Sequence, residues 1–346
     1  GCGMHILIRE GSAARNYAAL APLLRTHPES CMFCCDDLHP DLLMQGHIDV
    51  HVRRALALGV DRFDALTCAS VNPVRHYGLA VGLLREGDPA DFIVVDGWRN
   101  FRVRRTYLAG RLVAADGRSL LPRRPARRVN RFRARPRTVA DFAVAAPAGR
   151  VPRINVIEAL NGQLITRHRR LRALIGDGGL VADGARDLLK IAVVNRYVPA
   201  APVALGFIRG FGLRAGALAS SIAHDSHNVV AVGAEDASLA AAVNLVIRHR
   251  GGVAAVGRGR SAVLPLPIAG LMSDADGRVV ARRYARLDRF AKRLGSRLDA
   301  PFMTLAFMAL LVIPDLKLSD RGLFSGRKWK FVPLCGRQRS TSNIHR

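Results

Sequence analysis

The sequence predicts an α/β protein in which a short parallel sheet with its helices comes first and a second α/β unit follows. Two apolar segments, HILIREGS from His5 and CMFCC from Cys31, have the length of strands and show no alternation of polar residues. Apolar strands without alternation are typical of a sheet that is covered on both faces. Helical patterns follow both segments, which is the strand, loop, helix order of parallel α/β architectures.

The composition and the residue pattern divide the chain into five segments. Residues 1–80 hold the two apolar strands and their helices, and residues 81–120 alternate short β-type runs with Gly, Asp and Pro turns. The latter pattern predicts a small β-unit. Residues 121–150 are expected to form an Arg-rich linker of low structural signal. Residues 151–332 are expected to form the second large unit, and residues 333–346 a frayed basic tail.

The second unit is predicted to mix strands and helices. Its β-type runs include INVIEAL, LLKIAVVNRY, VALGFIRGFG and NVVAVG, and Gly-rich turns connect them. Two long amphipathic patterns, DASLAAAVNLVIRHRGG and RYARLDRFAKRLG, predict helices.

The net charge raises the question of a nucleic-acid partner. The chain has 53 Lys and Arg residues against 27 Asp and Glu, which gives a formal charge of +26. One dense basic run extends from Arg123 to Arg137, and Phe132 is its only aromatic residue. Proteins that bind nucleic acids usually interleave aromatic side chains with basic ones for base stacking. We therefore favour a solvated run over a nucleic-acid interface, which stays as an alternative.

The cysteines and the hydropathy indicate a cytoplasmic protein with no membrane partner. The six cysteines are irregularly spaced, so free thiols are expected rather than a disulfide framework. CMFC has the C-x-x-C spacing, but it has no second pair, which favours a core strand over a zinc or redox site. No apolar run approaches the roughly 18 residues of a membrane-spanning helix.

Polar side chains follow both predicted strands of the first unit. Asp36 and Asp37 come directly after CMFCC, and Arg9, Glu10 and Ser12 end the earlier strand. The carboxyl ends of parallel strands are where α/β enzymes place catalytic groups, so an aspartate there could ligate a divalent cation or move a proton. The alternatives are that an aspartate caps the next helix and that the earlier residues form an ordinary exposed loop.

A polar cluster interrupts the apolar second unit. The five residues of HDSHN are His224, Asp225, Ser226, His227 and Asn228. Their His-x-x-His spacing suits a metal only in a helix or a sharp turn, because an extended strand points the two imidazoles to opposite faces. A substrate-facing or interface-building polar loop is the favoured interpretation.

Several long motifs resemble the bacterial-type adenine deaminases, which are metal-dependent hydrolases of the amidohydrolase superfamily. The first part carries GMHILIREGSAARN, FCCDDLHPDLLMQGHIDVHVRRALALGV and ASVNPVRHYGL. The second part carries GQLITRH, DLLKIAVVNRY, GFIRGFGLRAGALASSIAHDSHNVVAVG, LPLPIAGLMSD and PFMTLAFMALLVIPDLKLSDRGL, in the order of that family's C-terminal domain. The matches cover nearly everything except the Arg-rich run and the basic tail.

This resemblance implies a fold and a reaction. The first unit would be the C-terminal part of a metal-dependent-hydrolase (β/α)8 barrel, namely its last two strands, followed by the small β-unit and a separate α/β adenine deaminase C-terminal domain. The reaction would be hydrolysis of adenine to hypoxanthine and ammonia, in purine salvage and adenine catabolism. The resemblance assigns Asp36 as a metal ligand and proton carrier, with Asp37 as the alternative. It places Arg9, Glu10 and Ser12 near the substrate.

The sequence also departs from the family pattern. The family's H-x-H pair and its other metal ligands have no counterpart in these residues. We therefore expect a truncated chain that is inactive alone and does not by itself hold the divalent metal of the family, which is manganese, iron or zinc. A homo-oligomer is expected for the intact enzyme. Two other functions are weighed: a non-catalytic remnant that serves as an oligomerisation or interaction module, and nucleic-acid binding through the Arg-rich run.

Overall fold

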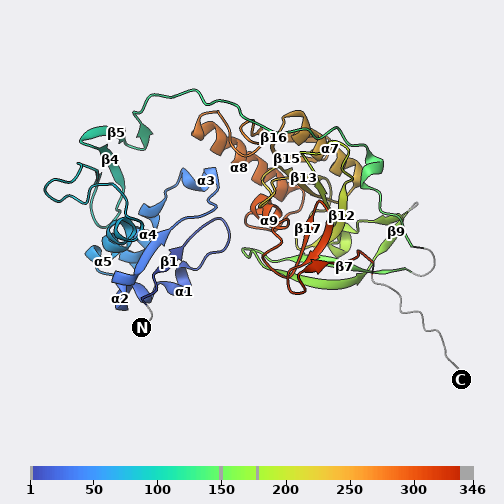
Figure 1. Cartoon of the computed structure of the whole chain (residues 1–346), viewed down its shortest axis with the longest axis horizontal. Coiled ribbons are helices and arrows are strands. Elements are labelled where there is room, and N and C mark those ends of the chain that lie inside the picture. Colours follow the sequence, from blue (N-terminus) through green and yellow to red (C-terminus); the bar gives the residue numbers. More distant parts are fainter. Residues whose placement is uncertain (1–2, 148–150, 177–178, 336–346) are drawn as a thin grey trace, which may run out of the picture. The chain divides into compact units, whose positions relative to one another are not determined.

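The chain folds into two compact units, Gly1–Pro125 and Ala126–Arg346 (Figure 1). The computed structural model describes residues 3–147, 151–176 and 179–335. The mixed α/β architecture predicted from the sequence is confirmed in it. Most of the predicted basic tail lies outside the described residues.

The first unit is built on two parallel strands, β1 (Ile6–Arg9) and β2 (Cys31–Cys34). Their register pairs Ile6 with Cys31 and Arg9 with Cys34, so both strands end at the same edge. Ile8 and the first three residues of β2 are buried, as expected from the absence of alternation. The accompanying helices are α1 (Tyr17–Leu20), α2 (Leu23–Thr26), α3 (Pro40–Leu43), α4 (Ile48–Ala57), α5 (Arg62–Leu66) and α6 (Asn72–Tyr77), with one π-helical turn at Thr67–Val71.

Local sequence signals explain where these helices begin and end. The pattern NYAALAPLLR forms two short helices rather than one, and Pro22, which has no N–H to donate, lies between them. Asp61 caps α5 by accepting hydrogen bonds from the backbone N–H groups of Phe63 and Asp64. Gly78 ends α6 in a left-handed conformation with φ of 60°, which glycine adopts without strain.

A four-stranded antiparallel sheet lies in the segment for which a small β-unit is predicted. Its strands are β3 (Phe92–Val95), β4 (Val103–Leu108), β5 (Arg111–Ala115) and β6 (Arg118–Ser119), and they pair in chain order. The turn between β4 and β5 consists of Ala109 and Gly110, both with positive φ. Such a turn matches the twist of the strands that it joins.

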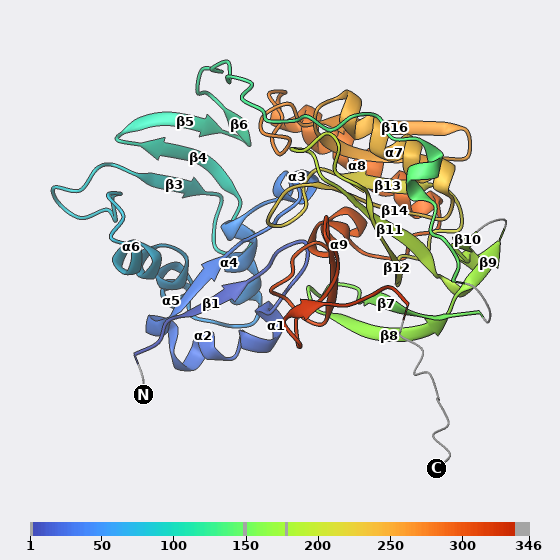
Figure 2. The ribbon, with the colours of Figure 1, turned by 45° about the vertical axis from the view of Figure 1, so that its right-hand side comes forward.

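The second unit is built on an eight-stranded mixed sheet with the order β16-β15-β13-β14-β11-β12-β7-β8, which Figure 2 shows from the side. Only the pair β7 and β12 is parallel among the neighbours in this sheet, within the part of the chain that the structure describes. The strands are β7 (Arg153–Ala159), β8 (Thr166–Arg172), β11 (Leu189–Val194), β12 (Ala204–Arg209), β13 (Ala217–Ser220), β14 (Val229–Gly233), β15 (Gly252–Gly257) and β16 (Arg260–Pro265).

Among its described residues, this unit also has three α-helices and two small sheets. The helices are α7 (Asp236–Arg248), α8 (Gly277–Arg293) and α9 (Pro301–Phe307). The small sheets consist of β9 (Leu174–Gly176) with β10 (Gly179–Val181), and of β17 (Leu316–Ser319), β18 (Gly322–Ser325) and β19 (Lys330–Phe331). No helix of the described residues is long and apolar enough to cross a membrane.

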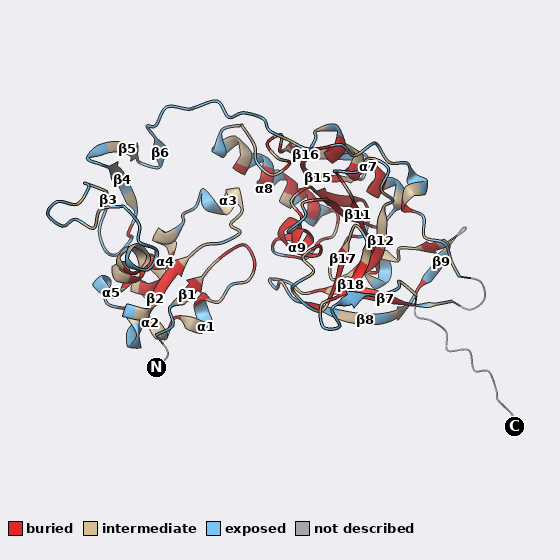
Figure 3. Cartoon of the chain, viewed as in Figure 1, coloured by how far each residue is buried: buried red, intermediate tan, exposed pale blue. Residues whose placement is uncertain are grey.

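Small side chains let α7 pack closely on the large sheet. Ala192, Ala217, Ala219, Ala231 and Ala254 are buried in one cluster with the apolar residues of α7. Figure 3 shows this burial along β11, β13 and β15. Alanine loses no side-chain entropy on burial, and its small volume allows close approach of a helix to a sheet.

The segment expected to be a linker contributes to this core. Phe132 and Phe142 are buried in the α7 cluster, 7% and 0% exposed. The carbonyl of Arg196 accepts hydrogen bonds from the backbone N–H groups of Arg133 and Ala134. Most residues of 126–142 are exposed and have little regular secondary structure, but two aromatic side chains anchor this segment to the second unit.

This packing predicts where a protease will cut. Brief trypsin treatment should cleave first after Arg123 or Arg127, where the backbone is exposed. Cleavage after Arg133 and Arg137 should be slower, because Arg137 is held by Asn244 and its side chain is only 10% exposed. N-terminal sequencing of the early fragments tests this. An early fragment that begins at Ala134 or Thr138 would contradict the packing of this segment.

Candidate functional site

A carboxylate pair and a guanidinium meet where β1 and β2 end. Nη1 of Arg9 lies 3.0 Å from Oδ2 of Asp36, and Nη2 of Arg9 lies 3.9 Å from Oδ2 of Asp37. The side chain of Asp36 is 58% exposed, whereas that of Asp37 is 29% exposed. Parallel pairing brings these residues together from positions far apart in the sequence. Asp36 is the more accessible of the two carboxylates.

Ser12 connects the two strand-end loops rather than facing solvent. It is 1% exposed, and its hydroxyl oxygen accepts a hydrogen bond from the backbone N–H of His39 at 2.9 Å. The backbone N–H of Ser12 donates to the carbonyl of Asp37 at 3.0 Å. These bonds fix the loop that carries both aspartates. The position of Ser12 suits a positioning residue better than one that binds a substrate.

The carboxylate of Glu10 forms ion pairs with two arginines. One of its carboxylate oxygens lies 3.2 Å from Nη1 of Arg54 and 3.9 Å from Nε of Arg15. Arg54 also lies over the ring of Tyr17, with Cζ 3.9 Å from the ring centroid. The side chain of Glu10 is only 24% exposed. Its negative charge therefore interacts mainly with Arg54 and Arg15.

A buried histidine near this site is absent from the sequence-based candidates. His51 on α4 is 2% exposed and packs against the rings of Tyr17 and Phe33. Its Nε2 lies 4.0 Å from Sγ of Cys35. Burial lowers the pKa of His51 and raises the pKa of Cys35 to about 11, so both groups are neutral at pH 7. The helical spacing of His51, Val52 and Ala55 marks this buried face, but spacing alone does not distinguish a polar role from core packing.

The HDSHN residues form a turn between β13 and β14, so the two imidazoles come together. The ring centroids of His224 and His227 are 5.7 Å apart, and His224 stacks on Phe307 at 4.4 Å. Desolvation by burial lowers the pKa of His227, and neighbouring positive charge lowers it further. Asp225 is 81% exposed. The turn therefore has one exposed carboxylate and two histidines that lie against the protein.

Arg196 supports this turn from the end of β11 and was not expected from the sequence. Its backbone N–H donates to Oδ1 of Asn228 at 3.2 Å, and its guanidinium donates to the hydroxyl of Tyr197. That hydroxyl in turn donates to the carbonyl of Ser226 at 2.9 Å. Asn228 is 2% exposed, so its side chain holds the turn in place and does not reach solvent.

Comparison with known proteins gives matches over both units of the chain. Residues 163–330 match the model of the adenine deaminase C-terminal domain, and residues 2–113 match that of the amidohydrolase family. An adenine deaminase of Salinibacter ruber is 58% identical over 331 residues, which is 95% of this chain and 60% of that protein. The chain is similar to the C-terminal part of adenine deaminases.

Other adenine deaminases match over the same extent. The adenine deaminase of a Sulfurovum species is 52% identical over 97% of this chain, and that of Methanosarcina barkeri is 48% identical over 96% of it. The chain spans about three fifths of the length of these relatives, 61% in both cases. The similarity to adenine deaminases therefore extends over both units of the chain.

The amidohydrolase family is typically metal-dependent, but the residues present do not by themselves fit a metal. Among the described residues, no group of three or more His, Cys, Asp and Glu side chains is placed to hold an ion. A catalytic metal normally needs about three protein ligands. Asp36 lies instead beside the Arg9 cation. This carboxylate is therefore paired with a cation that the protein itself supplies.

Lys317 provides a buried amine that contacts Phe307, the residue on which His224 stacks. It is 0% exposed, and its Nζ donates to the carbonyls of Leu164 and Phe307 at 2.7 and 3.0 Å. Burial lowers its pKa from 10.5 to about 7. A neutral amine has two N–H donors, which is the number that these two carbonyls require.

The lowered pKa predicts a pH-dependent stability. Between the folded-state pKa and the unfolded value of 10.5, the unfolded chain binds the proton and the folded chain does not. Stability should therefore rise with pH in this window. Relative to Lys317→Met, the free energy of unfolding should increase by about 3 kcal/mol between pH 7 and pH 9.5. Urea unfolding of both proteins at a series of pH values measures this. Equal pH dependence in the two proteins would show that Lys317 stays charged in the fold.

Proposed function

We propose that this chain takes part in the hydrolysis of adenine to hypoxanthine and ammonia, in purine salvage and adenine catabolism. The observation that carries the proposal is an accessible carboxylate, Asp36, which a salt bridge to Arg9 holds at the end of two parallel strands. These strands lie within the residues that match the amidohydrolase family. The names of the relatives supply the substrate, because they are adenine deaminases.

In this proposal β1 and β2 are the last two strands of a (β/α)8 barrel. Residues 1–80 would belong to that barrel, and residues 151–332 would form the separate C-terminal domain. The burial of Ile8 in β1 and of the first three residues of β2 supports a barrel origin, since parallel strands normally have neighbours on both sides. A divalent metal, manganese, iron or zinc, would need ligands beyond those that the described residues bring together.

Asp36 would carry protons in the reaction. Water adds across the C6–N1 double bond of adenine, and its oxygen bonds to C6. One of its protons passes to the Asp36 carboxylate, which then delivers it to the departing amine, and the other proton ends on N1 as the C6 hydroxyl becomes a carbonyl. The bond from C6 to oxygen forms, the bond from C6 to the exocyclic nitrogen breaks, and ammonia leaves. Arg9 would hold the carboxylate at the strand end, and Asp37, at 3.9 Å from the same guanidinium, is the alternative proton carrier.

The remaining candidate residues differ in how freely they could contact a substrate. Arg9 and Glu10 lie at the edge where the substrate would bind, although both are engaged in ion pairs. Of the HDSHN residues, the exposed Asp225 and Ser226 are the ones that could contact a ligand or a second subunit.

We propose that the intact enzyme is a homo-oligomer, because the resemblance to adenine deaminases implies one. A cytoplasmic location is supported by the five described cysteines, all of which are free.

The experiment is an assay of ammonia release from adenine. The protein to use is this chain joined to the N-terminal part of the Salinibacter ruber relative that the match leaves out. Adenosine and cytosine serve as control substrates. Release from adenine alone supports the proposal. A folded, metal-loaded protein that releases ammonia from none of the three, or from a control substrate instead, would refute the assignment.

A further inference from the structure

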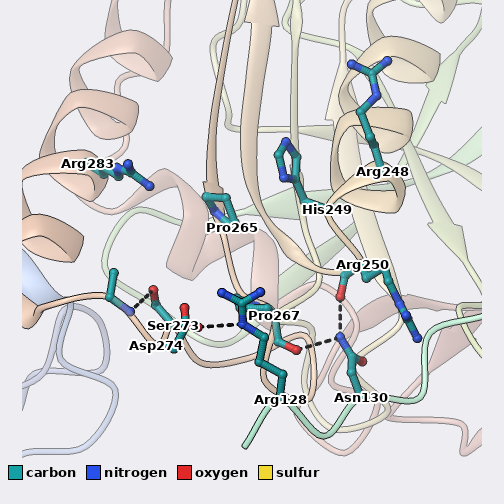
Figure 4. Close-up of a pocket in the computed structure, with 11 residues that line it drawn as sticks. Arg128, Asn130, Arg248, His249, Arg250, Pro265, Pro267, Ser273, Asp274 and Arg283 are labelled. Atoms are coloured by element: carbon teal, nitrogen blue, oxygen red, sulfur yellow. Dashed lines mark hydrogen bonds and ion pairs between the residues drawn. The ribbon is translucent and has the colours of Figure 1, made fainter. Parts of the chain in front are cut away.

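The second unit contains a cavity with several basic side chains in its wall. It has a volume of about 510 Å³ (Figure 4). Four arginines and one histidine contribute to its wall: Arg128, Arg248, His249, Arg250 and Arg283. A volume of this size is in the range of small-molecule sites. The cavity is a feature separate from the strand-end carboxylates of the first unit, and its capacity to bind a ligand does not depend on the proposed function.

Three different elements bring the basic residues together. Arg248 ends α7, and His249 and Arg250 follow it. Arg283 comes from α8, and Figure 4 shows it entering from the other side of Pro265. Arg128 belongs to the Arg-rich run, for which the sequence predicts a solvated segment.

Hydrogen bonds hold the Arg-rich run at the edge of the cavity. Nδ2 of Asn130 donates to the carbonyls of Arg250 and Pro267 at 2.6 and 3.1 Å. The backbone N–H of Ala269 donates to the carbonyl of Val129 at 2.7 Å. The run is therefore tied to both the end of α7 and the loop after β16. Arg128 is placed by this framework before any ligand arrives.

Most of the positive charge here has no protein counter-charge. Nε of Arg128 lies 2.6 Å from Oδ2 of Asp274. Among the described residues, no carboxylate lies within ion-pair distance of Arg248, Arg250 or Arg283. Four arginines and the single aspartate of the lining leave a formal charge of +3 with His249 neutral. Like charges gathered in a concave site repel each other and attract anions.

A structural explanation accounts for only part of this arrangement. Basic residues at the end of a helix interact favourably with its dipole, which covers Arg248 and His249. Arg250 has φ of 54°, a left-handed conformation that favours glycine. Arg128 and Arg283 come from other elements, so the dipole of α7 does not explain why they line the same cavity.

We propose that this cavity binds a small molecule through a diphosphate or triphosphate group. The planar guanidinium groups of arginine present paired N–H donors that match phosphate oxygens, and several arginines around one cavity suit a ligand with several phosphates. A nucleic-acid strand is the less suitable occupant, because it needs an extended basic track with aromatic side chains for its bases. The lining has no Phe, Tyr or Trp.

Calorimetric titration of the full chain with sodium tripolyphosphate tests the proposal. We expect saturable binding of one tripolyphosphate per chain. The double variant R248Q/R283Q should weaken binding at least tenfold. The matched control R282Q/R289Q removes the same charge from two exposed positions of α8 outside the cavity, and it should change the affinity less than twofold. Circular dichroism checks that both variants fold.

A second variant should act in the opposite direction. Asp274→Asn removes the carboxylate that competes with phosphate for Arg128, so it should tighten tripolyphosphate binding severalfold. The proposal is overturned by absence of saturable binding at millimolar tripolyphosphate. Equal losses in the two double variants would also overturn it, because they would show a diffuse effect of net charge. So would binding of a single-stranded RNA that saturates at lower concentration and that tripolyphosphate does not displace.

Discussion

Replacing Asp36 by Asn is expected to lower the turnover of adenine by roughly 100-fold or more. The substitution is made in the extended protein, which is this chain joined to the N-terminal part of the Salinibacter ruber relative. The amide keeps the size of the side chain but cannot accept and return a proton. Adenine binding should change much less, since the amide oxygen can still accept a hydrogen bond from Arg9. Steady-state kinetics of ammonia release should therefore show a loss in kcat with little change in KM.

Asp37→Asn is the matched control for this prediction. Asp37 is adjacent in sequence, faces the same guanidinium and is less exposed, so its substitution should cost far less than tenfold in kcat. A large loss from Asp37→Asn with none from Asp36→Asn would move the role by one residue. If neither substitution had an effect, the end of β2 would have no part in catalysis.

Replacing Asp236 by Ala is expected to lower the free energy of unfolding of the second unit by about 3 kcal/mol. Nζ of Lys190 lies 2.7 Å from Oδ2 of Asp236, and Lys190 is only 2% exposed. Without the carboxylate, a buried ammonium keeps only the carbonyl of Phe142 as acceptor. Urea unfolding followed by Trp329 fluorescence measures the change. Trp98→Phe removes the only other tryptophan, so the signal comes from this unit.

An ion pair of similar length on α8 provides the comparison. Lys292 lies 2.6 Å from Asp288, but its side chain is 45% exposed. Asp288→Ala should therefore cost less than about 1 kcal/mol. The double variant K190M/D236A should be more stable than D236A alone, because it buries no lone charge. Equal effects of the Asp236 and Asp288 substitutions would mean that burial does not set the strength of the Lys190 pair.

The apolar strands and strongly periodic helices could be predicted from the sequence. CMFCC contains β2, LLKIAVVNRY contains β11, and the Ala-rich pattern after Glu235 forms α7. In each of these elements the apolar residues that define the pattern are mostly buried in the folded unit. By contrast, TRHRRLR forms edge strand β8, which the local pattern does not predict, because its charged residues resemble a loop and its pairing partner β7 supplies the order.

The parts that could not be predicted depend on contacts between distant residues. Phe132 lies in an Arg-rich run and Phe142 in an Ala-rich stretch, and only the position of α7 shows that they are buried. Parallel pairing places Arg9 between Asp36 and Asp37, whereas the sequence shows only that each group follows a strand. Ser12 and Asn228 were expected near the substrate, yet their polar atoms bond to backbone groups of neighbouring loops.

We propose that these residues supply the Asp36 strand end of an adenine deaminase and do not alone assemble its metal site. The most direct measurement compares the 346-residue chain with the extended protein, both purified free of host enzyme, for bound manganese, iron and zinc and for ammonia released from adenine. We expect near-stoichiometric metal and sustained turnover in the extended protein, with neither in the 346-residue chain. Metal-dependent deamination of adenine by the 346-residue chain at a comparable rate would overturn this proposal.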